Sequence, residues 1–591
     1  MEKTVTNTET LLLVDDGVPQ ATILIAQNPT SVTHLAAKEL QYCIWQITGV
    51  TLPISNQLTE TTGIPIYLGD LARTVLGVEK TSQRNIGEIE SLVYDIYFLP
   101  GAIILYGQDT KVSTGVEIDY SIATDQQQLD SDKLQIPGMF DQQGTLWAVY
   151  DFLERFCGVR FYGPKAISVV FSRCPTLEII PENIQRRPAI PHISGSLTWD
   201  WPLMKGQFGS PSNDAIRLYE RRMRLGGIPW QTNHTLHSYP ERFPKSRYPQ
   251  FYGGEGFEKL CYSSDALARQ VAQDAQDYFE GAEALGLGLP QSSSYYPVVP
   301  EDAAQYCQCI RCLQSLEPHQ NDVSRSKNGV NLFNDGRASH LWFKFVNKVA
   351  KLLAKTHPDK FISTLAYENY FWYPEGIQLE ANIAIAPCLA VRNHWHLDYR
   401  QNELEQYALW AAESRPLFLW NYYCFPEEAA VIQQWQCFPG FMAHYLEQII
   451  KGYARDDVKG VFLCGIGEQV DFYITIKLYN DPLQSVDDLL DEFFSLYFGP
   501  ASEPMQTFYT LIEQIYSTPQ NWDQDGGFHQ TEVMAWGRLG TQERMKQLEQ
   551  LIKKAEKLAI EQKFSERVRY WKEGIWNYMR EGRRNYLCGE S

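Results

Sequence analysis

Hydrophobic and polar positions in the first 187 residues alternate between short apolar runs and helical periodicities. Apolar residues fill the run Ala21–Ala26, and from Thr33 to Ile47 they recur at helical spacing until Gly49 ends the pattern. A second amphipathic stretch, Gly144–Gly158, ends in another glycine. Further apolar runs predict strands at 64–68, 94–98 and 102–106. These patterns predict an N-terminal α/β domain over residues 1–187, which ends at a Pro-rich segment.

After that segment the chain repeats one pattern, a short buried run followed by an amphipathic helix. This alternation implies a parallel sheet with right-handed crossovers. Since no Gly-rich dinucleotide turn opens a helix, a closed barrel is favoured over an open sheet. The fold class predicted is therefore α/β, with a (β/α)8 TIM-like barrel over residues 188–482. Seven strands are predicted, with 260–263 as a candidate eighth: His192–Leu197, Trp230–His234, Tyr295–Val299, Phe361–Tyr367, Ile383–Val391, Leu417–Tyr423 and Val458–Cys464.

Beyond Asp481-Pro482 every periodicity is helical, so residues 483–591 are predicted to form a C-terminal helical domain. The net charge of −19 and the lack of a Lys/Arg run argue against nucleic acid and against an anionic membrane surface as partners. No window approaches the roughly 18 apolar residues of a membrane span. The apolar run 11–14 is too short for a signal-peptide core, so a cytoplasmic location is expected.

Composition adds one further clue, because 13% of the residues are aromatic. Most of these rings are expected in the core, where each buries a large area. Aromatic faces also line sugar-binding clefts, since the C–H faces of pyranose rings pack on them. We therefore expect a carbohydrate substrate as the partner, while the oligomeric state is not predicted.

Polar and aromatic side chains follow the predicted strands at the positions where a barrel builds its active site. Catalytic candidates are Glu468, Asp302 and Glu368, each at the end of a different strand. Cleaving a glycosidic bond requires one carboxylic acid and a second carboxylate, and Asp302 with Glu468 is the favoured pair. The alternative for each is helix capping or pairing with an arginine, while Asp335 is expected at the surface. Substrate-binding candidates are His234, His237, Tyr367, Arg392, Trp395, Trp420 and Tyr422.

A cysteine cluster, Cys307, Cys309 and Cys312, offers three thiols within six residues. These thiols can supply most of a tetrahedral zinc site, but paired C-x₂-C halves are absent and no fourth ligand is identifiable. Reduced thiols are therefore the favoured interpretation, and no metal or other cofactor is predicted. His234 and His237 lack helical ligand spacing, so hydrogen bonding to substrate hydroxyls is preferred for them.

Several stretches resemble DUF4838, a bacterial family of unknown function. That family is grouped with the alpha-glucuronidases, and its N-terminal domain with the non-catalytic domain of beta-hexosaminidases. The resemblance covers nearly the whole chain and implies a glycoside-hydrolase-like barrel. Its Pro-x-Asp motif, here Pro300-Glu301-Asp302, adds weight to Asp302. The stretches are GTLWAVYDFLERFCGVRFYGP (144–164), LCYSS (260–264), VVPEDAAQYCQCIRC (298–312), STLAYENYFWYP (363–374), PLFLWNYYCFP (416–426), KLYNDP (477–482) and LLDEFFSLYFGPA (489–501).

Three functions remain open from the sequence. The first is a glycoside hydrolase that uses paired carboxylates to cleave an oligosaccharide or polysaccharide fragment. A uronic acid or an amino sugar is the sugar residue considered for cleavage. The second is a non-catalytic carbohydrate-binding barrel that keeps the aromatic cleft without a working acid pair. The third is a metal-dependent hydrolase or lyase that uses the cysteine cluster or the histidines.

Overall fold

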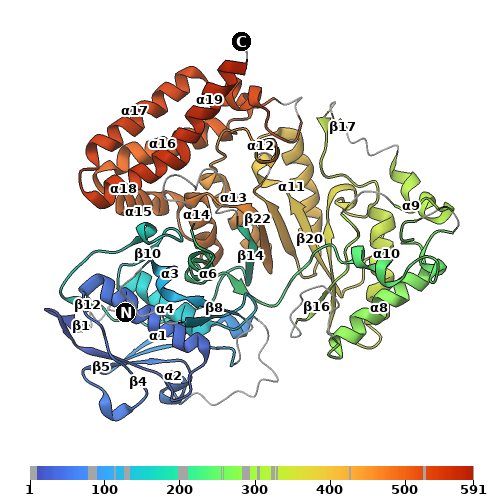
Figure 1. Ribbon diagram of the computed structural model, residues 1–591. Coiled ribbons are helices and arrows are strands. Elements are labelled where there is room, and N and C mark those ends of the chain that lie inside the picture. The colour runs from blue at the N-terminus through green and yellow to red at the C-terminus, as the bar shows by residue number, and fades with distance from the viewer. Residues whose placement is uncertain are drawn as a thin grey trace, which may run out of the picture.

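The computed structural model describes residues 10–77, 89–111, 115–125, 133–197, 211–254, 256, 258–282, 293–302, 306–320, 326–327, 330–424, 428–523 and 527–589. It confirms the predicted fold class, an N-terminal α/β unit, a barrel-like sheet and a helical C-terminal region (Figure 1). In Figure 1 the N-terminal unit lies at the lower left in blue and cyan, and the C-terminal helices lie above it in orange and red.

A six-stranded sheet forms the N-terminal unit, in the order β13-β6-β7-β5-β3-β4. Helix α1 (Ser31–Thr48) begins at the capping side chain of Thr30 and ends at Gly49, whose φ of 76° is left-handed. Helix α4 (Gly144–Phe156) packs on α1 and on β7. The strands are β3 (Ala21–Leu24), β4 (Ile54–Ser55), β5 (Ile64–Leu68), β6 (Tyr94–Leu99), β7 (Ala102–Gly107) and β13 (Ile184–Arg186).

The barrel-like sheet contains six parallel strands in the described residues, in the order β14-β22-β21-β20-β19-β16. The first and last parallel strands of the chain, β14 and β22, are neighbours, which is the pairing that closes a barrel. The strands are β14 (His192–Leu197), β16 (Tyr295–Pro297), β19 (Phe361–Ala366), β20 (Ile383–Leu389), β21 (Phe418–Tyr422) and β22 (Gly460–Ile466). Helices between them include α8 (Asp265–Phe279), α10 (Ser339–Leu353), α11 (Leu397–Ala411) and α13 (Ala443–Arg455).

Residues 228–236, where a strand is predicted, run between β14 and β16 without forming a strand ladder. The N–H groups of Thr235 and Leu236 both donate to Val299 O, and the Trp230 ring stacks on Phe418 with centroids 4.3 Å apart. Pro229 has no N–H to donate, which favours this irregular path. Residues 260–263 form a turn and not the candidate eighth strand. In the described residues the sheet therefore stays open between β14 and β16, and residues 230–236 pack in this interval.

The C-terminal helices pack against both other parts of the molecule. Trp571 Nε1–H donates to Gln469 Oε1 at 2.9 Å, just after β22, and Arg567 Nε–H donates to Ile167 O at 2.9 Å. These bonds attach the helices to the barrel and to the N-terminal unit. Helix α14 (Gln469–Asn480) follows β22 and belongs to the barrel, and the C-terminal helices are α15 (Val486–Phe498), α16 (Ser502–Ser517), α17 (Gln542–Leu558), α18 (Gln562–Trp571) and α19 (Asn577–Gly589).

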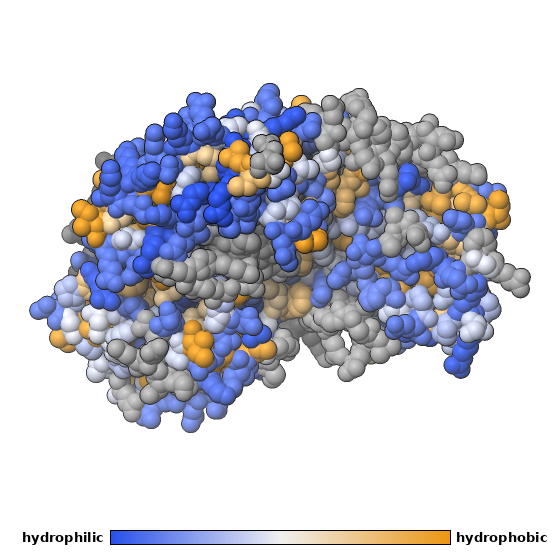
Figure 2. All heavy atoms as spheres, turned by 45° about the horizontal axis from the view of Figure 1, so that its top comes forward, coloured by the Kyte–Doolittle hydropathy of each residue, from blue (hydrophilic) through white to orange (hydrophobic). Residues whose placement is uncertain are grey.

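One face of the molecule is drawn in Figure 2 with its residues coloured by hydropathy. On the face drawn in Figure 2 hydrophilic residues dominate, and the hydrophobic ones appear as small separate groups. Within the described ranges, no helix combines the length and the apolar character that crossing a membrane requires.

Candidate active site

Aromatic side chains from three places in the barrel gather around Tyr367, which follows β19. The ring of Tyr422 on β21 lies 6.2 Å from that of Tyr367, and the His234 ring lies 5.9 Å from it. Trp420, two residues before Tyr422 on β21, has its ring 6.1 Å from that of Tyr422. Four of the predicted substrate-binding residues are thus brought together: Tyr367, Trp420 and Tyr422 from β21 or just after β19, and His234 from the irregular segment between β14 and β16.

The carboxylates of Asp302 and Glu368 both affect the pKa values of groups in this region. Both carboxylates raise the pKa of the Tyr367 hydroxyl, after the larger effect of its burial. Both also raise the pKa of the Cys388 thiol, again after burial. Asp302 reaches this region through His234, whose Nε2 lies 3.4 Å from Asp302 Oδ1 and whose ring lies 5.9 Å from that of Tyr367. Asp302 is 64% exposed, whereas Glu368 is half-buried.

His234 links Asp302 to the aromatic cluster. Its Nδ1 lies 2.7 Å from Pro300 O, so Nδ1 carries a hydrogen and donates it. Its Nε2 lies 3.4 Å from Asp302 Oδ1, which sets the side chain of Asp302 relative to the Tyr367 ring. His237 is exposed, and its Nδ1 lies 2.5 Å from His234 O. His237 therefore supports the His234 loop from the outside.

Glu368 has an unusual backbone conformation, with a φ of +45°. A non-glycine residue in the left-handed region costs energy and persists only where its surroundings fix it. Two neighbours do so here. Glu368 N–H donates to Asn334 Oδ1 at 2.9 Å, and Asp335 N–H donates to Glu368 O at 2.7 Å. Strain held in this way is frequent at active sites.

Asp335 differs from its expected place at the surface, because its side chain is buried. Burial is possible because Arg337 reaches back to it, with Nε 3.1 and 3.2 Å from the two carboxylate oxygens. Asp335 O also accepts hydrogen bonds from the N–H groups of Phe371 and Trp372. The segment that holds the Glu368 loop is thus anchored by a buried ion pair.

Glu468 has a different set of neighbours. Its carboxylate pairs with the guanidinium of Arg392, which has no exposed surface and also donates from Nη1 to Tyr423 O at 2.8 Å. Asp471, on α14, completes the group. Burial raises the pKa of Asp471 to about 8, Arg392 opposes this, and Glu468 adds to it. The structure therefore places Glu468 in a buried ionic cluster with Arg392 and Asp471, while Asp302 contacts His234 beside the Tyr367 ring.

Two expected substrate-binding residues are buried in other contacts. Arg392 is fully buried in its ion pair. Trp395 is buried against Tyr445 and Tyr516, with ring centroids 5.0 and 6.0 Å apart, so it packs between the barrel and α16. In this conformation neither side chain is open to a ligand, because packing covers both.

Residues that the sequence interpretation did not select also line the aromatic cluster. The Phe333 ring lies 5.7 Å from Tyr367 and 6.2 Å from Tyr422. Phe528, from the C-terminal region, stacks on Phe333 at 4.5 Å. Neither residue follows a predicted strand, so its position in the sequence gave no reason to expect it at the site.

The cluster has the groups that cleavage of a sugar linkage needs. Two carboxyl groups of different exposure can serve as proton donor and as nucleophile or base. Aromatic rings can pack on a sugar face, and Tyr367 and Tyr422 also carry hydroxyl groups. No group in the cluster requires a cofactor for this chemistry.

Comparisons with known proteins agree with this architecture. A family model described as a domain of unknown function (DUF4838) matches residues 210–510. A family GH115 4-O-methyl-alpha-glucuronidase with specificity for decorated arabinogalactans is similar in structure at 11% identity, with a TM-score of 0.55, over 96% of this chain and 72% of that one. No curated protein matches the sequence.

Two further solved structures have lower TM-scores. A family 89 glycoside hydrolase from Clostridium perfringens has a TM-score of 0.45 at 8% identity, over 92% of this chain and 60% of that one. An N-acetyl-beta-hexosaminidase from Streptomyces plicatus has a TM-score of 0.36 at 11% identity, over 84% of this chain and 92% of that one. The similarity to the glucuronidase establishes a glycoside-hydrolase-like fold, and at this identity it speaks for the fold alone.

Proposed function

The chain belongs to the DUF4838 family, and from this premise and its site we propose that it is a glycoside hydrolase that uses Asp302 and Glu368 as its carboxyl pair. One observation carries the proposal: the two carboxylates follow adjacent strands, β16 and β19, and His234 links them, with its Nε2 3.4 Å from Asp302 Oδ1 and its ring 5.9 Å from that of Tyr367, the residue before Glu368. The substrate class is an oligosaccharide or polysaccharide fragment, because rings and hydroxyls dominate the site.

The two carboxyl groups have different roles in this proposal. Glu368 is assigned as the proton donor, because this half-buried residue follows Tyr367 directly and its backbone is held by Asn334 and Asp335. Asp302, which is exposed and faces His234 Nε2, acts as nucleophile or base. His234 positions Asp302 through its contact with Pro300 O. Glu468 does not act on the substrate and instead neutralises Arg392 in the core.

Binding is assigned to Tyr367, Tyr422 and Trp420. The Trp420 ring lies on Phe462 at 4.0 Å, which holds it in a fixed plane. A fixed ring loses little entropy when a sugar packs on it. Because Arg392 is buried, recognition in this proposal relies on rings and hydroxyls and not on a carboxylate-binding arginine.

The test is a screen of aryl glycosides and glycan libraries with the full chain, followed by Glu368→Gln and Asp302→Asn on any substrate found. We expect each substitution to lower kcat by about 10²–10⁴-fold, the usual contribution of general acid–base catalysis. Glu301→Gln, next to Asp302 and paired with Lys259 at 2.6 Å, is the matched control and keeps turnover. Unchanged turnover in both Glu368→Gln and Asp302→Asn would overturn the proposal.

The same screen distinguishes the second candidate, a carbohydrate-binding barrel. The observation that favours it is the ring cluster itself, since Tyr367, Tyr422 and Trp420 can hold a sugar without any acid. Glycan binding that survives Glu368→Gln with Asp302→Asn, in a protein that turns over no glycoside, supports binding alone. Loss of glycan binding in Trp420→Ala is expected under both candidates.

A further inference from the structure

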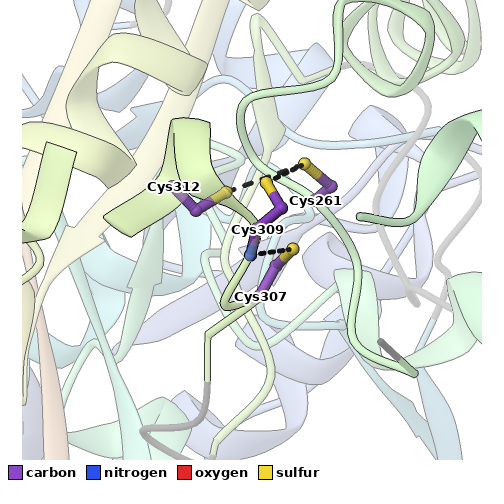
Figure 3. Close-up of side chains that lie close together, drawn as sticks. All are labelled: Cys261, Cys307, Cys309 and Cys312. Atoms are coloured by element: carbon purple, nitrogen blue, oxygen red, sulfur yellow. Dashed lines mark hydrogen bonds between the residues drawn. The ribbon is translucent and has the colours of Figure 1, made fainter. Parts of the chain in front are cut away.

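Four cysteine thiols from two separate parts of the chain meet in one buried place (Figure 3). Cys261 lies three residues before the Ser264 cap of α8, and Cys307, Cys309 and Cys312 lie around the start of α9 (Ile310–Gln320). All four Sγ atoms lie within 4.8 Å of one another, and all four residues are buried. Cys261 is the fourth ligand that spacing along the chain did not reveal.

The sulfur distances fit a tetrahedral metal ion. Cys261 Sγ lies 3.7 Å from Cys309 Sγ and 3.6 Å from Cys312 Sγ. A disulfide requires about 2.05 Å, and all four cysteines are free. Four thiolates around zinc, each about 2.3 Å from the metal, lie about 3.8 Å apart in a regular tetrahedron. The observed separations therefore suit an ion at the centre of the group.

The hydrogen bonds of the sulfur atoms also agree with a metal site. Cys309 N–H donates to Cys307 Sγ at 3.4 Å. The Cys312 thiol donates to Ser263 Oγ at 3.3 Å, and a Cys312 thiolate would accept from the same hydroxyl. Donors of this kind orient thiolates and stabilise their charge in metal sites. A set of four thiolates selects a soft or borderline ion, and zinc is the usual occupant of such sites.

We propose that Cys261, Cys307, Cys309 and Cys312 bind one Zn²⁺ as a structural site. Four protein thiolates fill a tetrahedral coordination shell, so the metal keeps no open position for water or substrate. Metal-dependent hydrolysis by these cysteines, one of the possibilities left by the sequence, therefore does not apply to this site.

The metal joins two loops, and one of them carries Asp302. In the sequence, Tyr306 follows Asp302 by four residues, and Cys307, Cys309 and Cys312 come directly after it. The Tyr306 hydroxyl donates to Asn369 Oδ1 at 2.6 Å, one residue after Glu368. Zinc thus holds the far end of the Asp302 loop against the residues around Glu368. Only this positioning role rests on the proposed glycosidase function, and zinc binding itself does not.

The first experiment is elemental analysis of the full chain purified under reducing conditions. We expect about one zinc per chain in the unmodified protein, and a several-fold loss in Cys261→Ser and Cys312→Ser. Cys43→Ser is the matched control, because Cys43 is also a buried free thiol but lies in α1. Less than stoichiometric zinc in the unmodified protein, or full zinc in Cys261→Ser, would overturn the proposal, as would stoichiometric iron.

A second measurement keeps the proposal testable if the variants fold poorly. The unmodified chain is stripped with a chelator and titrated anaerobically with Co²⁺. Tetrahedral thiolate coordination gives intense visible ligand-field bands and a sulfur-to-cobalt charge-transfer band, both abolished by added Zn²⁺. Absence of these bands, or a disulfide from Cys261 to Cys309 or Cys312 in the alkylated native protein, would contradict a metal site. Neither readout depends on glycosidase activity, so failure of the proposed function leaves this result unaffected.

Discussion

The backbone N–H of Glu368 and the side-chain Oδ1 of Asn334 form a hydrogen bond of 2.9 Å, which ties the proposed acid to a buried polar network. Asn334 Nδ2 donates in turn to Glu403 Oε1 at 2.7 Å and to Cys388 O at 3.0 Å. Glu403 also accepts from Ala390 N–H at 2.8 Å and pairs with His394 at 2.9 Å. One buried amide therefore sets the left-handed backbone on which the Glu368 side chain depends.

Replacing Asn334 with alanine is expected to destabilise the protein by about 2–4 kcal/mol, because it leaves several buried partners unsatisfied. Urea unfolding followed by fluorescence measures the change. Asn347→Ala is the control, since Asn347 makes similar side-chain bonds to Gln378 O and Glu380 N but is only half-buried. Equal losses in the two variants would contradict the central role of Asn334.

The Arg392–Glu468 pair is expected to behave as a core ion pair. Glu468→Gln leaves the guanidinium without its charge partner and should cost about 3–5 kcal/mol. Arg392→Met combined with Glu468→Gln should cost less than the sum of the single changes, because neither charge then remains alone. Thermal unfolding of the three variants measures this coupling. A stable Glu468→Gln that loses turnover would instead return Glu468 to the catalytic pair.

Asp471 predicts a fall in stability with rising pH. Its pKa of about 8 in the folded state lies above the unfolded value of roughly 3.9. Between these values the folded protein binds more protons, so stability present at low pH is lost as the pH rises through about 8. Asp471→Asn mimics the neutral acid, which meets Tyr509 and Met442 N–H. The free energy of unfolding should change less between pH 5 and pH 8 in the variant than in the unmodified chain. Equal changes in the two proteins would contradict the raised pKa of Asp471.

His444 predicts a second pH effect at the surface of α13. The Glu513 carboxylate, with Asp487 adding to it, raises the pKa of His444 to about 9. The pKa of His444 is therefore higher in the folded than in the unfolded state. The contribution of the ion pair to stability is then fully present below a pH of about 6.5. It is lost as the pH rises through about 9. Comparing the unmodified chain with His444→Gln from pH 6 to 10 should reveal a difference that shrinks with pH. A constant difference would mean that packing, not charge, dominates.

Much of the fold was predictable because its signals are local. Strands β19 and β20 and helices α1 and α4 were predicted within a few residues, since each depends on an apolar periodicity that its own segment carries. The stretch at 230–234 has one apolar residue, Trp230, followed by four polar ones, and it forms no strand. Its path depends on Pro229 and on contacts with Val299 and Phe418, which are distant in sequence.

By itself, the sequence determined the α/β class, the placement of polar residues after strands, and the candidate set that contains Asp302, Glu368 and Glu468. Only the tertiary structure decided that Asp302 and Glu368 share the neighbourhood of Tyr367, while Arg392 takes Glu468 into the core. It also brought Cys261 to Cys309, 48 residues away along the chain. The physical reason is that hydrophobic periodicity is read within one element, whereas the pairing of charges and thiols is set by how distant elements pack.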